Sequence, residues 1–342
     1  MYSKRLLIVG IPQPEHVGAH FLAAARHLSL DTRILDNRQA WSRSLWVNRV
    51  FHHLAARRPP HLRQFSRKVV AACRDFEPEL LLVTGISAPD HRVLQEIGRL
   101  KMHRMNYLTD DPWNPRNGAA FFWAALREYD VVWSPRRANL EDLRRHGCKA
   151  VEYLPFGYNP AVHFCEAPRD AEERERFTCD VVFVGGADAD RLPVAKALVR
   201  AGLKVHLYGG YWGRDKELRP YWRGFVYGRE LRLAVTCAKV NLCFGRRANR
   251  DGHAMRSLEL PAMKACLVVE DTPEHQELYG ADGECVVYYH DLPGLVKQAQ
   301  ALCREPARAR QLGENARRKI CEASRHTYTD RLQAMLERAP NT

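Results

Sequence analysis

Short apolar runs that alternate with helix-like segments, twice over, most limit what this chain can fold into. In the first half, such runs occur at residues 6–10, 79–85 and 130–135. The same alternation restarts with CDVVFVGG at 179–186 and continues through KVNLCF at 239–244. Fully apolar runs of this length are typical of parallel strands that are covered by helices on both faces. We therefore expect an α/β protein with two parallel sheets, one in each half.

The stretch at 166–177 is rich in charge, and we expect it to link the two halves. This predicts an N-terminal domain at residues 1–165 and a C-terminal domain at 166–325. Ligands of parallel α/β domains bind beyond the carboxyl ends of the strands. Two such sheets joined by a linker are therefore expected to face a cleft between the domains.

Composition narrows the class of protein without choosing a function. The 342 residues include 53 Lys and Arg against 40 Asp and Glu, which gives a net charge of +13. Such a surface attracts nucleic acid, anionic lipid or phosphorylated small molecules, and charge alone does not choose among them. No run of about 18 apolar residues predicts a membrane span, and no secretory leader is expected. The ten cysteines include no Cys-x-x-Cys pair, which favours reduced thiols in the cytoplasm over a zinc site.

Two candidate phosphate-binding features follow strands of the second half. Gly185 and Gly186 end a strand, where backbone amides can approach a phosphate, and Arg191 could add positive charge. The alternative is an ordinary strand-to-helix turn. Further on, Arg256 and Glu259 are three residues apart and share one helix face. The carboxylate can accept ribose hydroxyls and the arginine can meet a pyrophosphate, although an exposed ion pair would have the same spacing.

Two other segments of the second half could complete a nucleotide site. The basic loop at 245–253 contains Arg246 and follows a strand, which suits a diphosphate, although a solvated loop is an equal alternative. Tyr227 and Gly228 stand between a strand and a helix, among several other aromatic residues. A nucleobase could bind there, unless these aromatics serve packing alone.

In the first half, the candidates for chemistry are acids and histidines that follow strands. Asp110 and Asp111 could position hydroxyls, bind a metal or act as a base, or they could simply form a turn. His16 and His20 follow the first strand, where a histidine could accept a proton from a substrate hydroxyl. The alternative for both is a surface position.

The order of these motifs resembles the group-1 glycosyltransferases of the spore-maturation CgeB-like type, which have the GT-B fold of two Rossmann-like domains. The first half is similar through YLTDDP, YDVVWSP and YLPFGYNP. The second half is similar through a longer series, namely FVGG…R (183–191), LYGGYW (207–212), GFVYGREL (224–231), AKVNLCF (238–244), RSLELPAMKACLVVED (256–271), the loop from Glu274 to Glu284, and HTYTDRL (326–332).

The resemblance implies a metal-independent, hexosyltransferase-type enzyme that moves a sugar from a nucleotide-diphosphate sugar to a hydroxyl acceptor. By the resemblance, the second half binds the donor, Glu259 holds its ribose, and the first half binds the acceptor. In the wider family of retaining GT-B enzymes, another glutamate precedes this one with seven residues between them, and the present chain has Asp251 at that position. The last segment, 326–342, is expected to return to the first domain as a helix.

The resemblance also implies that no cofactor is needed beyond the sugar nucleotide. The acceptor is expected to be a saccharide, a lipid-linked molecule or a protein. The protein is expected in the cytoplasm, with a possible peripheral contact to an anionic membrane. Three alternatives stay open: a sugar-nucleotide epimerase, a non-catalytic sugar-nucleotide binder, and a basic nucleic-acid-binding protein, the last being the least expected.

Overall fold

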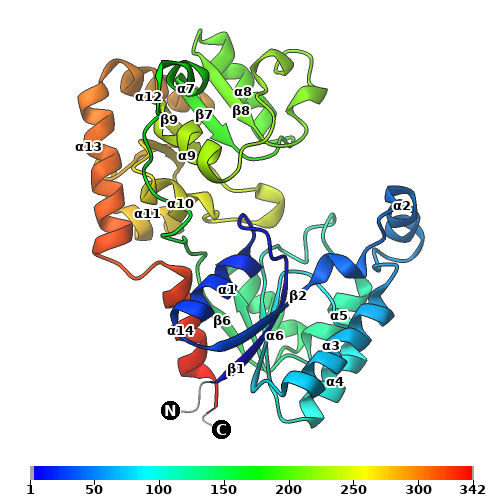
Figure 1. Cartoon of the computed structure of the whole chain (residues 1–342). Coiled ribbons are helices and arrows are strands. Elements are labelled where there is room, and N and C mark those ends of the chain that lie inside the picture. The colour runs from blue at the N-terminus through cyan, green and yellow to red at the C-terminus, as the bar shows by residue number, and fades with distance from the viewer. Residues whose placement is uncertain (1–3, 341–342) are drawn as a thin grey trace. The chain divides into compact units, whose positions relative to one another are not determined.

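A computed structural model describes residues 4–340 as two compact units (Figure 1). Unit 1 comprises residues 4–155, 248–250 and 328–340, and unit 2 comprises residues 156–247 and 251–327. Each unit contains one fully parallel sheet, so the prediction of two parallel α/β domains is confirmed. In the described range, no helix is both long and apolar enough to cross a membrane.

The sheet of unit 1 has six strands in the order β2-β1-β3-β4-β5-β6. Its strands are β1 (Arg5–Gly10), β2 (Asp31–Asp36), β3 (Leu80–Thr84), β4 (His103–Tyr107), β5 (Val131–Ser134) and β6 (Val151–Tyr153). Its helices are α1 (Val17–His27), α2 (Leu45–Leu54), α3 (Leu62–Phe76), α4 (His91–Arg99), α5 (Ala120–Leu126), α6 (Leu140–His146) and α14 (Tyr328–Arg338).

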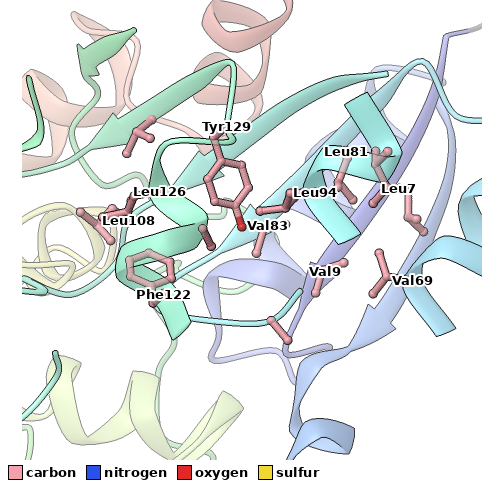
Figure 2. Close-up of a cluster of buried hydrophobic side chains, with 14 of the residues drawn as sticks. Leu7, Val9, Val69, Leu81, Val83, Leu94, Leu108, Phe122, Leu126 and Tyr129 are labelled. Carbon is pink, nitrogen blue, oxygen red and sulfur yellow. The ribbon is translucent and has the colours of Figure 1, made fainter. Parts of the chain in front are cut away.

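The central strands of unit 1 supply its main core. Leu7 and Val9 of β1 and Leu81 and Val83 of β3 lie in one buried cluster with side chains of α3, α4 and α5 (Figure 2). Tyr129 closes the same cluster. These strand residues alternate with Leu6, Ile8 and Leu82, which are equally buried. Both faces of the sheet are therefore covered, which explains why the strands read as continuous apolar runs.

The C-terminal helix α14 packs against α1 inside unit 1. The ring of Tyr328 stacks on His20 at 4.8 Å between centroids and meets Phe21 edge-on at 5.2 Å. Leu332 and Met335 are fully buried. Helix α14 therefore buries its apolar residues within unit 1, where it packs against the first helix of the chain.

The sheet of unit 2 has five strands in the order β11-β10-β9-β7-β8. Its strands are β7 (Cys179–Val184), β8 (Val205–Tyr208), β9 (Ala238–Cys243), β10 (Leu267–Glu270) and β11 (Val287–Tyr289). Its helices are α7 (Ala171–Phe177), α8 (Arg191–Arg200), α9 (Gly228–Thr236), α10 (Arg256–Ala262), α11 (Pro273–Tyr279), α12 (Leu292–Arg304) and α13 (Pro306–Arg317), which runs into a π-helical turn at Arg318–Glu322.

The expected linker at 166–177 contains secondary structure that the sequence analysis did not anticipate. Its second part is helix α7, because the Asp170 side chain accepts a hydrogen bond from the Glu173 backbone N–H at 2.8 Å and caps the first turn. Phe177 at its end is buried. The domain boundary expected after residue 165 falls inside unit 2, which begins at Phe156.

Candidate functional site

The carboxyl edge of the unit 2 sheet contains a point at which the strand order reverses. β7 pairs with β8 on one side and with β9 on the other. The chain therefore leaves β7 toward one edge of the sheet and leaves β9 toward the opposite edge. In open parallel sheets, ligands bind where the order reverses, beyond the strand ends. The loops after β7 and β9 are therefore where a ligand of unit 2 is expected to bind.

The turn after β7 is held by one side-chain hydrogen bond and one close backbone approach, both at Gly185 O. Gly185 O accepts a hydrogen bond from the indole N–H of Trp212 at 2.8 Å. Gly209, at φ +119°, packs so closely that a β-carbon there would lie 2.6 Å from Gly185 O. Only glycine fits position 209, because any side chain there would push the two backbone segments apart.

Arg191 holds the same turn from the start of α8. Its Nη1 donates to Gly186 O at 2.9 Å, and its guanidinium lies over the rings of Phe183 and Phe244 at 5.1 and 5.6 Å. Burial lowers the pKa of this guanidinium, and the negative charge of Asp188 acts in the opposite direction. The structure thus places Gly185, Gly186 and Arg191 together, with the arginine bracing the turn.

Arg256 and Glu259 form an ion pair at the first turn of α10. Glu259 also lies 3.6 Å from Nε2 of His163, and both of these side chains are almost fully buried. Arg256 stays partly exposed, and its Nε donates to Val184 O at the end of β7 at 3.4 Å. The pair therefore sits where the β7 and β9 connections meet. Burial lowers the pKa of His163, against the opposing effect of Glu259.

The burial of Glu259 corrects one expectation. An exposed i, i+3 ion pair was the alternative at this position, and the carboxylate is instead 1% exposed. On the same helix turn, the Ser257 hydroxyl lies 2.9 Å from Nε2 of His275, whose Nδ1 lies 2.7 Å from Glu270 O. Because a carbonyl can only accept, Nδ1 carries the proton and Nε2 accepts from Ser257. This buried network fixes the start of α10.

The loop after β9 carries the remaining charged candidates. Arg246 donates its backbone N–H to Asp251 at 2.9 Å, and its side chain lies 3.9 Å from Asp188. Asp251 therefore shapes the loop through a local hydrogen bond. The Arg246 side chain remains about half exposed, so it is available to an anion at the strand ends.

The aromatic candidates near the turn are exposed. Tyr227 precedes α9 and stacks on Phe225 with ring centroids 6.4 Å apart. Both rings are 55% exposed, and Tyr211 is 61% exposed. Gly228, at φ +49°, starts α9 with open space around its Cα. Exposed stacked rings can accept a planar ligand, since buried ones would already be occupied by packing.

In unit 1, Asp111 follows β4 and is completely buried. Its two oxygens accept from the Arg250 side chain at 2.7 and 3.1 Å, from the Asn139 amide at 2.8 Å and from the Trp113 backbone N–H at 2.9 Å. The neighbouring Asp110 is partly exposed and accepts from Asn249 at 3.3 Å. Asp111 thus anchors the 248–250 segment within unit 1.

The histidine candidates lie at the start of α1. His20 is buried against Tyr328, so the alternative of a surface histidine is wrong for this residue. His16 is the residue that precedes the first turn of the helix, and burial lowers the pKa of its imidazole. A histidine that is neutral at pH 7 can accept a proton.

Sequence reasoning did not mention His163 of unit 2, and it named Glu274 only as the start of a loop that carries the family resemblance. His163 lies far from Glu259 in sequence, so no local motif pointed to their contact. Glu274, in α11, lies so close to Gly252 that a β-carbon at 252 would overlap its carboxylate. Within residues 4–340, this half-buried carboxylate has no hydrogen bond or ion pair. The acidic loop that begins at Glu274 and the glycine next to Asp251 were the available signals for this residue.

Comparison with known proteins bears on the class of this chain. Residues 191–337 match the family model described as glycosyl transferase-like. The match covers less than half of the chain, and it includes α8, α10 and the acids beside them. No curated protein matches the chain.

Solved structures are similar over nearly the whole chain. Sucrose-phosphate synthase from Thermosynechococcus elongatus is 14% identical, with 98% of each chain covered and a TM-score of 0.66. HepE from Anabaena, in complex with UDP-glucose, is 13% identical over 97% of this chain and 98% of its own, with a TM-score of 0.64. A Listeria monocytogenes protein described as a UDP-N-acetylglucosamine 2-epimerase is 11% identical over 98% and 96%, with a TM-score of 0.58.

These likenesses establish the GT-B fold, and at this low identity they establish the fold alone. The family match adds that the chain contains a glycosyl transferase-like segment. The prediction of a GT-B fold is therefore confirmed, and the family match over residues 191–337 supports the glycosyltransferase class. The narrower CgeB-like grouping and the individual site residues stay predictions.

Proposed function

We propose that this protein transfers a sugar from a nucleotide-diphosphate sugar to a hydroxyl-bearing acceptor, with the donor bound by unit 2. One observation carries the proposal. The Arg256–Glu259 pair lies beside the glycine turn where the strand order reverses, inside the glycosyl transferase-like segment. A related fold, that of HepE, has been solved with UDP-glucose, which supports a donor of this chemical class.

Each donor group has a chemically suitable partner in this site. The Glu259 carboxylate suits the ribose, because it can accept charge-assisted hydrogen bonds from the ribose hydroxyls. The partly exposed side chains of Arg256 and Arg246 suit the diphosphate. The exposed ring of Tyr227 suits the base by stacking.

The reaction breaks the bond between the anomeric carbon and the diphosphate oxygen, so negative charge gathers on the leaving diphosphate. Guanidinium groups fixed near that oxygen stabilise the charge as it develops. We propose that this arrangement works without a metal ion or another cofactor, on a hexosyl donor. Acceptor recognition is assigned to unit 1, whether the acceptor is a saccharide, a lipid-linked molecule or a protein.

Among the unit 1 candidates, Asp110 is the best suited to accept the proton of the acceptor hydroxyl. Asp111 already accepts four hydrogen bonds, and the ring of His20 is stacked within the core. Asp110 keeps a partly exposed carboxylate. All ten cysteines are free thiols, and six of them are buried, which fits the proposed cytoplasmic location.

The test is a thermal-shift screen of the whole protein against nucleotide sugars with different bases. A donor at 100 times its Kd stabilises the native state by about 2.7 kcal/mol, which shifts the melting temperature measurably. The donor that binds is then incubated with acceptor mixtures, and the products are separated by mass. Sugar on an acceptor supports transfer, an isomerised free sugar indicates an epimerase, and no stabilisation by any nucleotide sugar overturns the proposal.

A further inference from the structure

Helix α2 stands apart from the other helices of the described chain because none of its ten residues is buried. Leu45 is 85% exposed, Trp46 76% and Leu54 83%. Trp41, just before the helix, is 38% exposed. Large apolar side chains clustered on a surface mark a contact that the isolated chain does not make.

Three apolar residues of α2 form a stripe. Trp46, Val50 and Leu54 are spaced four residues apart, so they follow one another along a single side of the helix, where Trp46 and Leu54 are exposed and Val50 is half-buried. Leu45 lies outside this stripe. With 3.6 residues per turn, Val47 lies at one edge of this side and Arg49 lies at the other edge. The helix is therefore amphipathic, and it exposes most of its apolar side together with the polar residues Arg49, His52 and His53.

Local hydrogen bonds, rather than core packing, hold the helix in place. The Asn48 side chain accepts from the Ser42 backbone N–H at 2.9 Å and donates to Ser42 O at 2.8 Å. The Ser44 hydroxyl accepts from the Val47 N–H at 3.5 Å and caps the first turn. A ten-residue helix is marginal in water on its own, so burial of the stripe would stabilise it.

The charge around α2 has one sign. From residue 37 to residue 74, the chain contains no Asp or Glu and nine Lys or Arg. Arg43 and Arg49 are exposed beside the stripe. Two copies of such a surface would repel each other, which argues against self-association through α2. An anionic partner with an apolar interior satisfies both the arginines and the stripe.

We propose that α2 is a membrane-docking helix that binds an anionic lipid surface. Trp46 and Leu54 enter the boundary between head groups and acyl chains, while Arg43 and Arg49 stay at the phosphate level. Amphipathic helices with tryptophan and leucine on one side and arginine at the border bind in this way. The proposal is independent of the donor site, since α2 belongs to unit 1 and carries none of the proposed donor contacts.

The experiment is co-sedimentation of the full chain with vesicles of phosphatidylcholine alone or with about one-third phosphatidylglycerol. The wild-type chain is expected to bind the anionic vesicles, and to be released by high salt. The double variant W46S/L54S is expected to bind at least about tenfold more weakly because the stripe is lost. The variant R43Q/R49Q is expected to lose about tenfold and most of its salt dependence.

Leu100→Ser supplies the matched control, because Leu100 is an exposed apolar residue of the same unit outside the 37–74 segment. It should bind like wild type, and all variants should keep the wild-type melting temperature. Equal binding to neutral vesicles, no binding to anionic vesicles, or full binding by W46S/L54S overturns the proposal. So does light scattering that shows a wild-type dimer abolished by W46S/L54S, which would assign the stripe to a second copy.

Discussion

Asp111 in unit 1 and Glu259 in unit 2 are both buried acids that follow parallel strands, and both pair with an arginine. They differ in where the paired arginine comes from. Asp111 receives hydrogen bonds from Arg250 and Asn139, which are distant in sequence. Glu259 is held by Arg256 on its own helix turn and by His163.

This difference separates an acid that builds the fold from one that is suited to a ligand. Asp111 joins separate segments of unit 1, so its loss should be felt as lost stability. Glu259 sits beside a partly exposed arginine at the strand ends, where a ligand hydroxyl can join the pair. Motif reasoning ranked both as functional, whereas the contacts predict different responses to mutation.

The largest expected effect is that of Asp111→Asn on stability. The change removes the charge that pairs with Arg250, while Asn139 and the Trp113 N–H keep pointing at the site. Arg250 is 39% exposed, so the cost is expected at the lower end of the range for breaking a buried ion pair from one side, about 3 kcal/mol. Urea unfolding of the whole protein measures it. Asp142→Asn, which removes the partly exposed second partner of Arg250, is the control and should cost under about 1 kcal/mol.

If Asp111→Asn instead keeps its stability and loses only turnover, the division proposed between the two acids is wrong. Asp111 would then act in catalysis, as the sequence alone allowed.

A second prediction concerns the network under Glu259. Burial lowers the pKa of His275 from 6.5 to about 4. Between these values the unfolded chain binds a proton that the folded chain does not, so stability present above pH 6.5 is lost as the pH falls toward 4. For this residue the loss approaches about 3 kcal/mol, at about 1.4 kcal/mol per pH unit.

Urea unfolding at pH 7.5 and pH 4.5 tests this for wild type and His275→Gln. The variant should be the less stable at pH 7.5, and its deficit should shrink at pH 4.5, since glutamine does not titrate. His290→Gln, at an exposed histidine, should retain the wild-type pH dependence. A constant deficit at both pH values would show that His275 does not drive the loss.

Glu259→Gln is expected to weaken donor binding by about 2 kcal/mol, because a charged hydrogen bond to ribose becomes a neutral one. Stability should fall as well, since the carboxylate is buried against His163. Calorimetric titration with UDP, or with the nucleotide found in the screen, measures the affinity. Glu314→Gln, at an exposed ion pair with Lys264, controls for loss of one surface charge. Wild-type affinity in folded Glu259→Gln would remove this residue from the donor site.

The sequence was informative where local pattern decides structure. Apolar runs predicted both parallel sheets because those strands are buried on both faces, as Val181 and Val240 are. The i, i+3 spacing predicted the Arg256–Glu259 pair because helix geometry alone brings these side chains together.

Contacts between distant residues could not be predicted in this way. The Asp111–Arg250 pair joins residues 139 positions apart, and the 248–250 segment belongs to unit 1 although its neighbours in sequence belong to unit 2. Helix α7 was missed because its many charged residues are also typical of a linker, although Asp170 caps the helix. The burial of Glu259 depends on His163, whose role no spacing rule indicates.

The smallest expected effect is that of Glu274→Gln, and it tests whether the donor site contains an acid beyond Glu259. Glu274 lies against Gly252. The residue before this glycine, Asp251, stands at the position where the wider family of retaining GT-B enzymes has its first glutamate. A half-buried carboxylate without a partner in the described chain can accept sugar hydroxyls at little cost. The variant should therefore bind the nucleotide sugar about 1 kcal/mol more weakly, yet bind the free nucleoside diphosphate like wild type. Stability should be unchanged or slightly raised, since no ion pair is lost. Glu277→Gln, on the exposed side of the same helix, is the matched control. Equal loss for nucleotide sugar and nucleoside diphosphate would place Glu274 near the phosphates instead, and no loss for either would leave Glu259 as the single acid of the donor site.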